Sequence, residues 1–231
     1  DNPAKRIAML SVVAIFMLTL LIVSQATSGI AEEKANKVIE ILAAAVPLES
    51  VFLGKLLAMI GVGVIFVGFW GGLATVGSAA FAVTQVMGDK GVLVDQAWVS
   101  NLAPAVGWSS YIFLTVIYTI CTFLLYGSLF LGMGGLASSP REVQMLSFPL
   151  VVLQMIAFMM AASSVVGGME GPLGLAAQII PFTASYAMLG RAAVDGNLWV
   201  HAAAIAWQIL WITIMINLSV RLFRRGVLGD G

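Results

Sequence analysis

One histidine and one cysteine limit the chemistry that this chain of 231 residues could perform. Cys121 cannot form an internal disulfide alone, and a single histidine excludes a metal site built from several imidazoles. Gly107-Trp108-Ser109-Ser110 and Gly127-Ser128 place serines in apolar runs, but a nucleophilic serine needs a positioned base. His201 is the sole candidate for that base. We therefore expect a structural His201, with no catalytic residue and no metal site.

The sequence also lacks the motifs of nucleotide chemistry and of proton relays. Gly54-Lys55 is followed by Leu56, and no glycine lies five residues before Gly54, so the chain contains no P-loop. No acidic pair interrupts an apolar run, and such a pair would mark an ion or proton pathway. Gln154, Gln208 and Asn217 are instead typical of hydrogen bonds between helices. We expect no cofactor in this chain.

The charge-dense stretch 31–46 is the most informative part of the sequence. Glu33 and Lys37 form an i, i+4 pair in the favourable order, and Pro47 ends the pattern. The apolar positions recur at helical spacing and comprise Ala35, Val38, Ile39, Leu42 and Val46.

Two interpretations of this amphipathic helix are open. A helix that floats on lipid headgroups would carry mainly Lys and Arg on its polar face and aromatic residues below. This one has charges of both signs and no aromatic residue, which favours a protein partner. The residues expected to contact that partner are Glu33, Lys37, Val38, Glu40 and Leu42.

Composition places these features in a membrane protein. Hydrophobic residues make up 61% of the chain and charged residues 10%, with a mean hydropathy of +1.03. A soluble domain has about 25% charged residues, so this chain could not cover a soluble fold with polar surface. Its net charge is zero, which gives no field for a nucleic acid. We expect an all-α, polytopic bundle of transmembrane helices.

Five runs are long enough to cross a bilayer, which takes roughly 20 residues. They cover 7–29, 56–87, 108–136, 143–166 and 198–220, and the chain 1–231 forms one transmembrane domain. The segment 167–197 is broken by Pro172, Pro181 and several glycines, and predicts two short helices that dip into the membrane or lie on it. Gly68 and Gly72 form a GxxxG pair, which predicts close helix packing.

Basic residues in the connections predict the orientation. With five spans, one side of the membrane carries Lys34, Lys37, Lys55, Arg141, Arg221, Arg224 and Arg225, and the other carries Lys5, Arg6, Lys90 and Arg191. The more basic side is expected in the cytoplasm of a cell membrane, the inner membrane of a bacterium. The N-terminus of this sequence would then be outside and the C-terminus inside.

Two stretches resemble the ABC-2 type transporter permeases, and within them the NatB-like exporters. The first is Glu32-Glu33-Lys34 with Asn36-Lys37-Val38-Ile39-Glu40-Ile41-Leu42, followed by Gly54-Lys55-Leu56-Leu57 at the start of a span. The second runs from Ile180-Pro181-Phe182-Thr183 to Arg191, with Ala184-Ser185 where Ser-Pro is frequent in the family.

The resemblance implies more than these residues. It implies a six-span permease whose first span and outer domain would precede Asp1. It implies pairing with a second permease chain, in a homodimer or heterodimer, and docking onto cytoplasmic ATPase subunits that hold ATP and Mg. The segment 31–46 would be the coupling helix. The expected function is therefore that of the permease subunit of an ABC exporter, and the alternatives are an intramembrane serine protease or an unpowered small-solute channel.

Overall fold

The computed structural model describes residues 3–87, 104–137 and 139–228, and it is helical without strands over those residues. Five helices are long and apolar enough to cross a membrane, as the sequence predicts. The helices are α1 (Pro3–Ala35), α2 (Val38–Ala45), α3 (Leu48–Met87), α5 (Trp108–Leu136), α6 (Pro140–Val166), α7 (Gly171–Ile179), α8 (Pro181–Val194) and α9 (Leu198–Leu228).

Four of the five long helices extend beyond the apolar runs that predict them, and α5 has the predicted bounds. The candidate spans are Ala4–Ile30, Leu48–Phe69, Trp108–Leu136, Arg141–Val166 and Leu198–Gly226. The second begins at Leu48 rather than at residue 56, because hydropathy marks where a helix enters lipid and not where its hydrogen bonding begins. At 1.5 Å per residue, the 40 residues of α3 reach roughly 60 Å, about twice the hydrocarbon thickness.

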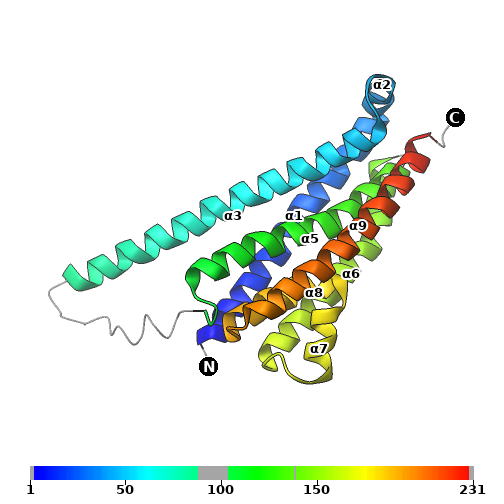
Figure 1. The fold of residues 1–231 in the computed structure, drawn as a ribbon. Helices are drawn as coiled ribbons and strands as arrows, with labels where there is room; N and C mark the ends of the chain where they lie inside the picture. The colour runs from blue at the N-terminus through cyan, green and yellow to red at the C-terminus, as the bar shows by residue number, and fades with distance from the viewer. Residues whose placement is uncertain (1–2, 88–103, 138, 229–231) are drawn as a thin grey trace.

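The long helices pack around α5. This helix contacts α1, α3, α6, α8 and α9, and α3 leads away from the bundle over its second half (Figure 1). Glycine permits close approaches between these helices: a Cβ added at Gly132 would lie 3.0 Å from Ser219 Cβ and 3.1 Å from its Cα on α9. A larger residue at this position would therefore require α9 to shift by a few tenths of an ångström.

The predicted packing pair Gly68 and Gly72 meets no other helix in the described part of the chain, so its close packing stays a prediction. A Cβ added at Gly68 or Gly72 would meet no atom of the described residues within 4 Å. Gly63, one turn earlier on α3, instead lies directly against the ring of Phe123. The GxxxG spacing shows only that two glycines share a helix face, and here that face points away from the other described helices.

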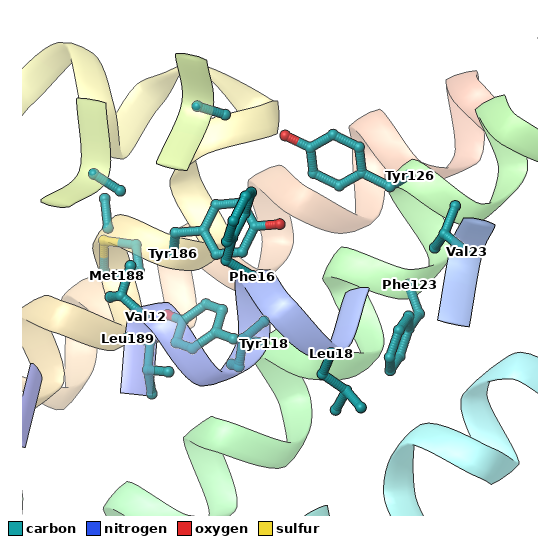
Figure 2. Close-up of a cluster of buried hydrophobic side chains, with 14 of the residues drawn as sticks. Val12, Phe16, Leu18, Val23, Tyr118, Phe123, Tyr126, Tyr186, Met188 and Leu189 are labelled. Atoms are coloured by element: carbon teal, nitrogen blue, oxygen red, sulfur yellow. The ribbon is translucent and has the colours of Figure 1, made fainter. Parts of the chain in front are cut away.

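The broken segment forms two short helices, as predicted. α7 and α8 meet at Ile180–Pro181 with a bend of 115°. α8 then enters the bundle, where Tyr186, Met188 and Leu189 contribute to a buried cluster with Val12 and Phe16 of α1 (Figure 2). Every residue of α8 from Thr183 to Gly190 is buried, so this short helix belongs to the core.

The bundle has two distinct ends. The start of α1, the α7–α8 pair and the start of α9 lie at one end, and α2 and the last turns of α9 lie at the other (Figure 1). This arrangement agrees with the alternating topology that five spans require. We refer to these as the α8 end and the α2 end.

Candidate coupling surface

A sharp turn separates α1 from α2. The predicted continuous helix over 31–46 is wrong, because α1 runs to Ala35 and a new helix begins at Val38. Lys37 has φ of 56°, in the left-handed region that ends a helix and costs an L-residue roughly 1–2 kcal/mol. The turn changes the course of the chain, and Ile39 is completely buried beyond it. Burial of this apolar side chain offsets the cost of the turn.

The apolar face of α2 is divided between the core and the surface. Ile39 belongs to the main hydrophobic cluster of the bundle. Val38, Leu42 and Val46 remain exposed, with Leu42 at 37%. These three side chains line a shallow groove between α2 and the first turns of α3, together with Glu33, Ser50, Val51, Gly54, Lys55 and Ala58.

An ion pair lies in the same groove. The Nζ atom of Lys55 donates to Glu33 Oε1 at 2.7 Å, which joins α3 to the last turn of α1. The predicted pair of Glu33 with Lys37 is wrong, because the turn at Lys37 ends the helix that would have aligned them. Lys55 is a site residue that sequence reasoning missed, and the only available signal was a lone cation in the second turn of an apolar helix.

Lys37 and Glu40 are the other charged residues predicted to contact the partner. Lys37 is exposed at the turn. Glu40 belongs to α2, but its side chain lies outside the described part of the structure, as do Lys90 and its connection. A second ion pair, between Arg224 Nη1 and Glu49 Oε1 at 3.2 Å, joins α9 to α3 at the same end, and both of its side chains are 55% exposed.

The α8 end has its own polar network. Arg191 donates from Nε and Nη2 to Asp195 Oδ2 at 2.9 and 2.7 Å, and from Nη1 to Gln178 Oε1 at 2.5 Å. The hydrogen bonds from Arg191, and next the backbone N–H of Asn197, lower the pKa of Asp195. The network ties α7 to the end of α8.

His201 has the structural environment that the sequence suggests. Its ring is buried, and Nδ1 lies 2.9 Å from the hydroxyl of Tyr118 on α5. This contact joins α9 to α5. Within the described residues, no group of three or more His, Cys, Asp or Glu side chains could hold a metal ion.

Fold and surface together define a polytopic membrane protein that presents a mixed apolar and charged surface at one end. Its sequence matches the family model described as ABC-2 family transporter protein over residues 1–222. The chain belongs to this family.

Two curated relatives match this chain over most of its length. The chain is 30% identical over 207 residues to the uncharacterized protein MJ1024 of Methanocaldococcus jannaschii, covering 87% of this chain and 44% of that protein. It is 26% identical over 222 residues to the uncharacterized protein YhaP of Bacillus subtilis, covering 93% and 49%. The chain thus spans about half the length of these relatives. No solved structure matches it.

Proposed function

We propose that this chain is the permease subunit of an ABC exporter, driven by ATP hydrolysis in a separate cytoplasmic ATPase subunit that docks at the α2 end. The single observation that carries the proposal is the groove beside α2, where Val38, Leu42 and Val46 are exposed around an ion pair. In the proposed complex, ATP and Mg bind in the ATPase, and this chain supplies the membrane path. We propose further that it pairs with a second permease chain.

The composition of the groove supports a protein partner over a lipid surface. The groove presents three exposed apolar side chains, and its carboxylate and ammonium group are already paired with each other. A protein surface can therefore cover the apolar side chains there without burying an unpaired charge. A helix that only floated on headgroups would need no such groove. Buried Ile39 also fixes α2 to the bundle, so a force on α2 can reach the membrane spans.

The basic residues support the orientation. Lys37, Lys55, Arg141 and Arg224 belong to the α2 end, which the positive-inside tendency assigns to the cytoplasm. An ATPase in the cytoplasm would then meet α2 first. The same rule directs the α8 end, with Lys5 and Arg191, to the outside.

The experiment introduces a charge at the groove. In Leu42→Asp, the carboxylate would be buried unpaired under the ATPase, so co-purification of the ATPase and permease-stimulated ATP hydrolysis should both be lost. The permease should still insert, because Leu42 lies outside every candidate span. The partner ATPase is sought first in the neighbouring gene.

Ile41→Asp is the matched control. Ile41 is 71% exposed on the adjacent α2 position and does not line the groove, so the same charge there should have the smaller effect. Retention of both ATPase binding and stimulated hydrolysis in Leu42→Asp would refute docking at this groove. Loss of membrane attachment of α2 with retained ATPase binding would favour the lipid-surface alternative.

A further inference from the structure

We propose that the Glu33–Lys55 ion pair transmits movement of α2 to the membrane spans. In this proposal the pair does not itself bind the ATPase. This inference rests on the proposed docking of an ATPase at α2. It assigns positioning roles to two residues, of which Lys55 is not part of the predicted coupling segment. Both side chains line the groove at α2, but they are paired with each other and are only 24% and 33% exposed.

The connections on both sides of α2 are potential points of bending. On the α1 side, Asn36 and Lys37 form a turn with Lys37 in the left-handed region. On the α3 side, Val46 is extended, with φ of −141° and ψ of 152°, and Pro47 follows. Neither connection continues the helical hydrogen bonding of α2 into its neighbour. A push on α2 would bend these joints unless the two flanking helices were held together.

The ion pair joins α1 to α3 close to α2. Lys55 Nζ and Glu33 Oε1 are 2.7 Å apart, and they join the last turn of α1 to the second turn of α3. Deeper in the bundle, the same two helices border an open groove lined by Leu21, Ile22, Gln25, Ala26, Gly29, Ala58, Met59 and Val62. Lys55 lines both this groove and the groove at α2. The pair therefore closes the end of the α1–α3 gap that lies nearest to α2.

Burial distinguishes this pair from the other ion pair at the same end. The side chains of Lys55 and Glu33 are 24% and 33% exposed, whereas both partners in the Arg224–Glu49 pair are 55% exposed. Glu33 Oε2 is buried and has no hydrogen-bond partner among the described residues. Removal of Lys55 would therefore leave a partly buried carboxylate without its counter-ion, which disfavours the close approach of α1 and α3. Solvent screens the Arg224–Glu49 pair much more strongly.

The test separates docking from transmission in the reconstituted permease–ATPase complex. Lys55→Gln and Glu33→Gln should keep ATPase co-purification within about twofold of wild type, while permease-stimulated ATP hydrolysis falls roughly fivefold or more, the range of an ordinary coupling free energy. Arg224→Gln is the matched control and should leave both quantities unchanged. The exchange Glu33→Lys with Lys55→Glu should restore most of the stimulation.

Each other result would overturn the inference. Unchanged stimulation in both single variants would show that the pair transmits nothing. Parallel loss of co-purification and stimulation would assign the pair to the docking surface. If the single variants reduce the yield of folded permease, the exchange decides, because recovered yield without recovered stimulation would make the pair merely structural. Failure of the proposed function is distinguishable, since Leu42→Asp would then leave ATPase binding intact.

Discussion

The two ends of the bundle hold their short helices in contrasting ways. At the α8 end, the residues from Thr183 to Gly190 are buried and α8 contacts α1, α5, α6 and α9. At the α2 end, Ile39 is buried while Val38, Leu42 and Val46 stay exposed. α8 follows the bend at Ile180–Pro181, and α2 follows the turn at Lys37. Since both helices begin after a break, they differ in how much of their surface the other helices cover. The described helices cover α8 from Thr183 to Gly190, whereas they leave one face of α2 exposed.

The largest expected effect comes from placing the same charge at each end. Ala187 is completely buried on α8, and Ala35 is exposed beside α2. Ala187→Asp should destabilise the protein by at least about 3 kcal/mol, because the carboxylate would be buried without a partner. Ala35→Asp should cost less than about 1 kcal/mol, the range of a charge at a helix end. Thermal unfolding and the yield of monodisperse permease in detergent measure the difference.

Equal losses for the two variants would break the comparison. Equal tolerance would mean that α8 is not held in the core. The exposed Ala35 position also provides the control for expression level, since both variants make the same alanine-to-aspartate change. A larger effect at Ala35 would indicate that the α2 end is packed in the permease even without a partner.

A smaller effect should come from the network around Asp195. Its pKa is lowered by hydrogen bonds from Arg191 and from the backbone N–H of Asn197. A carboxylate with a depressed pKa in the folded state stabilises the fold at pH values above its unfolded pKa of about 3.9, and that contribution is lost as the pH falls through the folded value. Asp195→Asn should therefore lower the unfolding temperature slightly at pH 7.

The same difference should shrink in acid. Wild type and Asp195→Asn should converge as the pH falls through the lowered pKa of the native Asp195 carboxyl, because that carboxyl is then protonated as well. Arg191→Gln serves as the second variant, since it removes the larger cause of the lowered pKa and should reduce the pH dependence of the difference, leaving the part due to the backbone N–H of Asn197. A gap between wild type and Asp195→Asn that stays constant from pH 7 to pH 3 would contradict this assignment of the stabilising contact.

Hydropathy was enough to predict the bundle, because a span must satisfy its backbone internally and present apolar side chains over a fixed length. The break in 167–197 was predictable for a similar reason, since Pro181 cannot continue α7. The depth of α8 was not predictable: Thr183, Ser185 and Arg191 give its sequence a polar character, yet the first two are buried. The burial of Thr183 and Ser185 depends on how α8 packs against α1, α5, α6 and α9.

The coupling surface, too, was predictable from the sequence only in part. The helical spacing of Val38, Ile39 and Leu42 correctly indicated that these residues are helical, but in one helix over 31–46 rather than in the shorter α2. It could not reveal the turn at Lys37, which depends on where Ile39 finds a buried position. The ion-pair partner of Glu33 could not be predicted either, because Lys55 is 22 residues away and meets Glu33 only when α1 and α3 are side by side. Likewise, the choice of Gly132 over Gly68 for packing depends on α9.

Photo-crosslinking at α2 tests the central claim most directly. A photoreactive benzoylphenylalanine at Leu42, in the permease expressed with its ATPase in intact cells, should form an adduct with the ATPase. The same group at Trp199, which is 85% exposed at the α8 end, should form none. An ATPase adduct from position 199, or none from position 42 while the complex still co-purifies, would contradict docking at the α2 groove.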